Sequence, residues 1–222
     1  MISLDNVEQY PAVDPQNMLG HIQDLPGQLV KAWETGLTLP VKGLRPPQNI
    51  VIAGVGGSAI GADLLASYVQ DSCPVPVFVQ RDYGLPAWAK DDETLLVASS
   101  HSGNTEETVS AFEEAKRRGC QIVAISRGGK LAELTSQSGS LWWKFVHNGQ
   151  PRSAVGWTFG LLLALFHRLG LALDAGKGIQ AASEAMLAQQ ELIAPHVPLI
   201  KNPAKRQAGQ LIDRWVCTVG SG

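Results

Sequence analysis

Four hydroxyl side chains lie close together in one segment of the sequence: Ser99, Ser100, Ser102 and Thr105. An apolar run from Thr94 to Ala98 leads into this segment, and a run with helical spacing, Glu106 to Arg118, follows it. The start of a helix presents free backbone N–H groups and the positive end of the helix dipole, and small hydroxyls add neutral donors without bulk. The segment therefore predicts a phosphate-binding loop. No lysine is nearby, which argues against a triphosphate site.

A glycine-rich turn, Gly54 to Gly61, stands in a similar position after the β-branched run Asn49 to Ala53. It is not a dinucleotide-binding fingerprint, because Ala59 occupies the place of the third glycine, and it lacks the lysine of a P-loop. Gly57 lets the backbone approach a ligand closely, and Ser58 can donate a hydrogen bond at the helix start. The alternative is a tight strand–helix turn in which Ser58 only caps the helix.

The hydroxyl segment has a similar structural alternative, in which Asn104 or Thr105 caps a helix and the two glutamates that follow complement its dipole. One cap needs one hydroxyl, whereas this segment offers several. Both turns also follow the carboxyl ends of predicted strands, where open parallel sheets bind their ligands. We therefore favour a binding role for Ser100, Ser102 and Thr105.

Arg152, in the segment Gln150-Pro151-Arg152, is either a surface charge or a cation that stabilises negative charge on a ligand, and its position alone does not decide between the two. The five histidines show no metal-ligand spacing, and four of them are interpreted as structural or exposed. His101 is the exception, because it lies inside the hydroxyl segment. No Gly-x-Ser-x-Gly motif supports a serine hydrolase.

The composition excludes several classes of protein. The net charge of −2 over 222 residues argues against a strongly basic nucleic-acid binder. The three cysteines form no Cys-x-x-Cys pair, so neither a disulfide framework nor a zinc site is indicated. Residues 1–10 lack the apolar core of a signal peptide, and the most apolar stretch, Trp157 to Leu173, is too short and too polar to span a bilayer. We expect a soluble, cytoplasmic protein.

Apolar strand-like runs alternate with helical runs through the middle of the chain, which is typical of a parallel sheet covered on both faces. The sequence therefore predicts an α/β fold, a three-layer αβα sandwich around a five-stranded parallel sheet. A helical run from Asp14 to Trp33, kinked or split at Pro26, precedes it. The predicted strands are 49–53, 75–79, 94–98, 121–126 and 141–146, with later helices at 154–169, 179–193 and 202–212 and a further strand at 215–219.

Several segments together resemble the sugar isomerase (SIS) domain: Gly56-Gly57-Ser58, Arg81-Asp82-Tyr83-Gly84-Leu85-Pro86 and the loop Ser99 to Thr108. More narrowly, the chain is similar to the bifunctional phosphoglucose/phosphomannose isomerases of archaea and bacteria. That closer likeness is carried by Asp14 to Met18, Gly128 to Leu131, Gln150-Pro151-Arg152 and Asn202 to Lys205.

The resemblance implies a flavodoxin-like SIS domain that binds a hexose 6-phosphate and interconverts glucose 6-phosphate or mannose 6-phosphate with fructose 6-phosphate. The family's phosphate loop matches Ser100, Ser102 and Thr105, and Gly57 and Ser58 match residues beside the sugar. Arg152 matches an arginine that stabilises an enediolate intermediate. The resemblance implies neither a cofactor nor a metal.

Members of this family have two SIS domains per subunit and work as homodimers. Their glutamate base and ring-opening histidine come from the second domain, and no glutamate here matches that base. The expected division is an N-terminal helical segment (1–48), a SIS domain (49–170), inter-domain helices (171–213) and the first strand of a truncated second SIS domain (214–222). We expect the reading frame to continue past Gly222, and this polypeptide alone to bind sugar phosphates without isomerising them well.

Two other functions stay open on the sequence. The first is a non-catalytic SIS module that senses a phosphosugar, although the first 48 residues show no basic helix-turn-helix of a regulator. The second is an amino-sugar isomerase, against which the Gln-Pro-Arg segment and Asn202 to Lys205 weigh.

Overall fold

The computed structural model describes residues 3–217, and its centre is a parallel sheet in the strand order β2-β1-β3-β4-β5. The predicted five-stranded parallel sheet is thus confirmed. Its strands are β1 (Asn49–Ala53), β2 (Val77–Gln80), β3 (Thr94–Ser100), β4 (Gln121–Ser126) and β5 (Leu141–Lys144). Strand β3 is longer than predicted, because Ser99 and Ser100 pair with Ile125 and Ser126 of β4.

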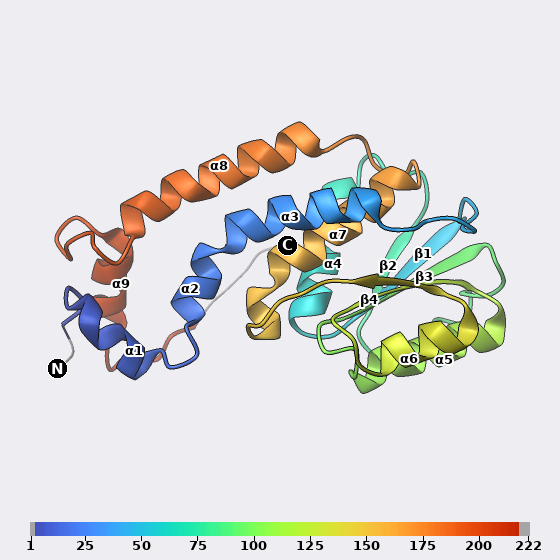
Figure 1. Ribbon diagram of the computed structural model, residues 1–222, viewed down its shortest axis with the longest axis horizontal. Helices are drawn as coiled ribbons and strands as arrows, with labels where there is room; N and C mark the ends of the chain where they lie inside the picture. The colour runs from blue at the N-terminus through green and yellow to red at the C-terminus, as the bar shows by residue number, and fades with distance from the viewer. Residues whose placement is uncertain (1–2, 218–222) are drawn as a thin grey trace.

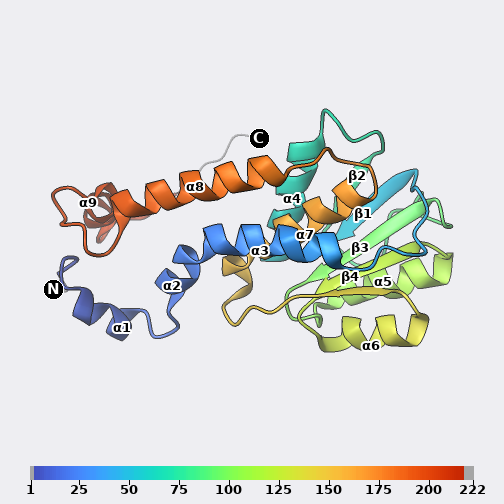
Figure 2. The ribbon, with the colours of Figure 1, turned by 45° about the horizontal axis from the view of Figure 1, so that its top comes forward.

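Helices cover both faces of the sheet, as Figures 1 and 2 show. Alternate residues of each strand point to opposite faces, so the sheet has two apolar cores. Ile50 and Ile52 of β1 belong to the core beneath α3 (Leu25–Thr38), α4 (Gly57–Val69) and α7 (Val155–Arg168). Val51 and Ala53 belong to the core beneath α5 (Glu106–Arg118) and α6 (Gly129–Ser138). This arrangement confirms the three-layer sandwich.

The helical run predicted at Asp14–Trp33 forms two helices, α2 (Met18–Gln23) and α3. The short elements η1 (Val7–Gln9) and α1 (Tyr10–Val13) precede them. The Asp14 carboxylate accepts hydrogen bonds from the backbone N–H groups of Met18 (2.7 Å) and Leu19 (2.8 Å), and so caps α2. Pro26 lies in the first turn of α3, where its missing N–H costs no helical hydrogen bond. Of the two alternatives predicted for Pro26, the helical run is therefore split there and not kinked, and Pro26 lies at the start of the second helix.

The last helices carry the chain away from the sheet. Figure 1 shows α8 (Gly176–Ile193) running beside α3 to the end of the molecule that holds α9 (Pro203–Leu211) and α1. Asn202 caps α9 by accepting a hydrogen bond from the N–H of Lys205 (3.0 Å). The buried Lys205 ammonium donates to the Asp5 carboxylate (3.0 Å), which ties α9 to the N-terminal segment.

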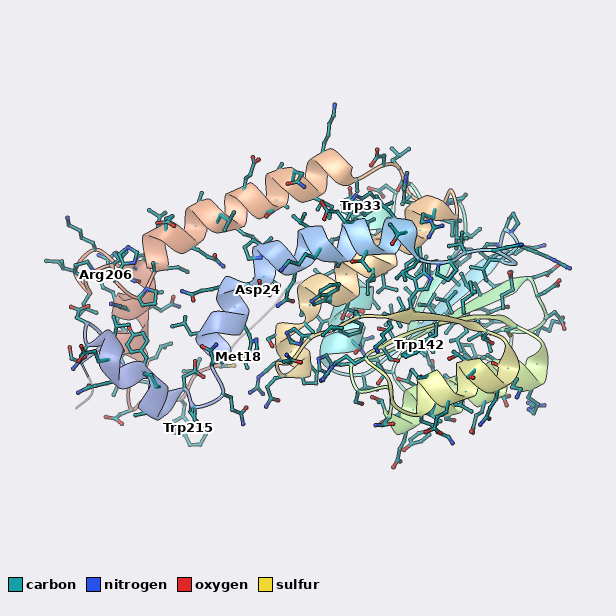
Figure 3. All side chains as sticks on the ribbon, in the orientation of Figure 1. Met18, Asp24, Trp33, Trp142, Arg206 and Trp215 are labelled. Carbon is teal, nitrogen blue, oxygen red and sulfur yellow. The ribbon has the colours of Figure 1, made fainter. Side chains whose placement is uncertain are left out.

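The strand expected at 215–219 is not seen in its described part. Residues 215–217 have no regular secondary structure, and the rest of that strand, like residues 220–222, lies outside the described residues. Figure 3 shows Trp215 at the end of the molecule remote from the sheet, and its side chain is fully exposed. A strand needs a partner for its backbone groups, and none is present there among residues 3–217.

None of the described helices combines the length and the apolar character needed to cross a bilayer.

Candidate functional site

The candidate site lies at the carboxyl edge of the sheet, between β1 and β3. The chain leaves β1 toward β2 on one side and resumes in β3 on the other, so the strand order reverses at this point. Helices that start from neighbouring strands at such a reversal leave a crevice between their N-termini, where doubly wound sheets bind ligands. Here the crevice separates the turn before α4 from the turn before α5.

The hydroxyl segment folds into a compact loop around Ser100. The Oγ atom of Ser100 lies 2.8 Å from Oγ1 of Thr105 and accepts a hydrogen bond from the N–H of Gly103 (3.0 Å). Ser100 is 1% exposed, whereas Ser102 is exposed and Thr105 is half-buried. The buried Ser100 hydroxyl therefore stabilises the loop and orients the Thr105 hydroxyl. Ser102 and Thr105 remain accessible to a ligand.

The capping alternative does not hold for either turn. Thr105 is the N-cap of α5, but its side chain makes no capping hydrogen bond. Asn104 instead accepts a hydrogen bond from the N–H of Lys130 (2.8 Å), and Ser58 accepts one from the N–H of His101 (3.3 Å). The first turn of α5 thus keeps backbone N–H groups without side-chain partners, which is the arrangement that suits an anion.

A cavity of about 250 Å³ opens between the two turns. Four of the six predicted site residues line it, namely Gly57, Ser58, Ser102 and Thr105. Ser100 lies beneath it through its contact with Thr105. Arg152 belongs to the short helix η2 (Pro151–Ser153) and is exposed; its neighbour Pro151 lines the cavity, but Arg152 itself does not.

Gly57 explains how the Gln-Pro-Arg segment reaches this cavity. A Cβ atom on Gly57 would lie 2.6 Å from the carbonyl oxygen of Pro151 and 3.2 Å from the Cα of Arg152. Any side chain at position 57 would therefore push η2 away from the start of α4. Gly57 allows backbone contact between two segments far apart in the sequence, and this contact brings the backbone of Arg152 beside the start of α4.

The segment Arg81 to Pro86 flanks the site on the side of β2. Tyr83 donates a hydrogen bond to the Glu106 carboxylate (3.0 Å), and this bond to the charged group raises the pKa of Tyr83. The N–H of Gly84 donates to Oγ of Ser110 (3.1 Å), also on α5. Glu106 is thus engaged in holding this segment against α5.

A histidine pair lies behind the loop, and the sequence pointed to only one of its members. Nε2 of His101 is 3.0 Å from Nδ1 of His147, and the two side chains are 8% and 6% exposed. Burial, followed by the positive charges of Arg127 and His147, lowers the pKa of His101 to about 4. Burial is also the main reason for the lowered pKa of His147. His147 had no motif around it to mark it, because the pairing depends on the packing of the loops after β3 and β5.

The pair predicts a specific dependence of stability on pH. A histidine that titrates near pH 6.5 when unfolded and near pH 4 when folded binds its proton more readily in the unfolded state. The free energy of unfolding is therefore expected to fall as the pH drops from about 6.5 to about 4. Urea unfolding of His101→Asn should show a flatter profile over this range. The exposed His196→Asn serves as the control and should keep the wild-type profile; equal slopes in both variants would contradict the assignment.

Within residues 3–217 no group of three or more histidine, cysteine or acidic side chains is arranged to hold a metal ion.

Comparisons with known proteins identify the family of the central domain. The SIS domain family matches residues 43–136. A bifunctional phosphoglucose/phosphomannose isomerase of Caldicellulosiruptor bescii is 43% identical over 190 residues, which cover 85% of this chain and 56% of that protein. One from Aquifex aeolicus is 32% identical, over 77% of this chain and 57% of its own length. The chain thus spans little more than half of these relatives.

Solved structures share the fold. The crystal structure of tagatose-6-phosphate ketose/aldose isomerase from Escherichia coli superposes with a TM-score of 0.61, covering 79% of this chain and 53% of that one, at 16% identity. Residues 43–136 therefore form a SIS domain, in a chain that is related to the bifunctional phosphoglucose/phosphomannose isomerases.

Proposed function

We propose that this chain binds the phosphate of a hexose 6-phosphate in the cavity between its two turns. The observation that supports it is the loop itself, in which the Thr105 hydroxyl contacts Ser100 and lies at the N-terminus of α5 without capping it, beside the crevice of the sheet. Ser58, from the turn at α4, and Ser102, from the turn before α5, supply further hydroxyls to the cavity lining. Neutral donors and a helix dipole suit a monophosphate dianion.

The chemistry we propose is the isomerisation of glucose 6-phosphate or mannose 6-phosphate to fructose 6-phosphate. It is supported by the names of the related isomerases and by the backbone of Arg152, which lies against Gly57 and next to Pro151 of the cavity lining. A base removes a proton next to the carbonyl group, and the electrons of the broken C–H bond move onto the oxygen atoms of an enediolate. The Arg152 guanidinium would stabilise that negative charge.

The general base is proposed to come from outside this site. Among the described residues, no aspartate or glutamate lines the cavity beside Thr105 or the neighbouring cavity beside His101. A carboxylate base must lie within hydrogen-bond reach of the proton that it removes. This agrees with the proposed division of the chain (1–48, 49–170, 171–213, 214–222), in which a second SIS domain or a second subunit of a homodimer completes the site.

Binding of glucose 6-phosphate tests the proposal. We expect isothermal titration calorimetry to show binding to the wild-type chain, and Thr105→Val to weaken it by about 10- to 100-fold, because a hydrogen bond to a charged group is lost. Thr108→Val is the matched control. The Thr108 hydroxyl is buried on the same helix and has no hydrogen-bond partner among residues 3–217, so its loss should leave affinity unchanged. Absence of binding to the wild type, or equal effects of the two variants, would refute the proposed site.

A further inference from the structure

A second and larger cavity, of about 470 Å³, lies beside the first. His101 and Pro151 line both cavities and so form their common wall. The other polar side chains that line the second cavity are Gln16, His21, Arg127, Asn148 and Gln150. Gln150 donates a hydrogen bond to Oε1 of Gln16 (2.6 Å), which joins the N-terminal segment to the loop before η2 across one side of this cavity.

The chemistry of this second cavity favours an anion. No acidic residue in the described part of the chain lines it, whereas Arg127, two imidazoles and three side-chain amides do. The Arg127 side chain is exposed and forms neither an ion pair nor a hydrogen bond with residues 3–217. An arginine with its planar set of donors free, surrounded by amides, is suited to a phosphate or carboxylate group.

The buried histidines give an independent indication. Nε2 of His147 is buried and has no hydrogen-bond partner among the described residues, although His147 contacts both His101 and His21. A buried polar atom without a partner costs free energy and needs an explanation. His147 contacts His101 and His21, which line the second cavity, so this unsatisfied polar group lies directly behind the cavity lining.

We propose that this second cavity binds the second anionic group of a sugar phosphorylated at both ends, such as a hexose 1,6-bisphosphate. This inference rests on the proposed function, since the first phosphate would occupy the Ser100–Thr105 loop. The sugar would lie over His101 and Pro151, the residues shared by the two cavities. Arg127 would then form an ion pair with the second phosphate. The bisphosphate would then act as a ligand that competes with the monophosphate and binds more tightly.

Calorimetric titrations of glucose 1,6-bisphosphate and glucose 6-phosphate into the same protein test this proposal. We expect the wild type to bind glucose 1,6-bisphosphate at least about tenfold more tightly than glucose 6-phosphate, because Arg127 forms hydrogen bonds with the charged second phosphate. Arg127→Gln should remove this advantage and leave the affinity for glucose 6-phosphate within about threefold. Arg206→Gln is the control, because Arg206 is exposed on α9 at the far end of the molecule, as Figure 3 shows.

The outcomes separate the two proposals. Equal affinity of the wild type for both ligands, or an advantage that persists in Arg127→Gln, overturns the second site while the phosphate loop stands. If Arg206→Gln removed the tighter binding of the bisphosphate to the same extent, the effect would be one of general charge, and the second site would also be overturned. Failure of glucose 6-phosphate to bind the wild type refutes the phosphate loop and, with it, the shared ligand.

Discussion

Replacing Gly103 with alanine is expected to lower the free energy of unfolding by about 3 kcal/mol and to abolish sugar-phosphate binding. Gly103 has φ +76°, a region that costs an L-residue about 1–2 kcal/mol. A Cβ atom there would also lie 1.8 Å from the carbonyl oxygen of Gly128, so the backbone would have to move, at about 1–3 kcal/mol. Because the N–H of Gly103 holds Ser100 Oγ, that movement would disorganise the loop.

Gly119→Ala is the matched control for this prediction. Gly119 ends α5 with φ +78°, but a Cβ atom there would meet no atom within 4 Å. Its substitution should lower the free energy of unfolding by only about 1–2 kcal/mol, the cost of the positive φ, and should leave sugar-phosphate binding unchanged. Urea denaturation and calorimetry on both variants measure the difference. Similar losses of stability in the two would show that the contact with Gly128 does not constrain the loop.

Replacing Arg152 with alanine is expected to weaken binding of an enediolate analogue, a sugar hydroxamate phosphate, by about 10²- to 10³-fold. Binding of glucose 6-phosphate should weaken by less than about tenfold, because the neutral carbonyl of the ground state gains less from the guanidinium than the charged intermediate does. Competition titrations of both ligands measure this ratio and require no turnover.

The control for Arg152 is Arg45→Ala. Arg45 is an exposed arginine that pairs with Asp92, and both residues precede their strands, at the amino edge of the sheet opposite the site. Its loss should affect neither ligand. If Arg152→Ala weakened both ligands by the same factor, Arg152 would be a binding residue and not one that stabilises the enediolate.

The parts of the fold that depend on local sequence patterns could be predicted from the sequence. Near-continuous apolar runs, each followed by a helical run, indicated a parallel sheet with both faces covered, and β1 and β4 have the predicted bounds. The N-terminal helix was predicted less well. The predicted helix starts at Asp14, but α2 begins at Met18, and the Asp14 carboxylate reaches forward to the N–H groups of Met18 and Leu19, a geometry that the spacing of residues does not reveal.

By itself the sequence determined the sheet, the two polar turns at its carboxyl edge and the likeness to the sugar isomerases, because these depend on neighbours along the chain and on residue types. Only the tertiary structure decided that Ser100 is buried beneath the loop and contacts Thr105. The same is true of the contact between His147 and His101, and of the packing of the Pro151 backbone against Gly57. The last two contacts join residues separated by long stretches of chain. Their geometry is set by how the loops after β1, β3 and β5 pack, and no local periodicity encodes that packing.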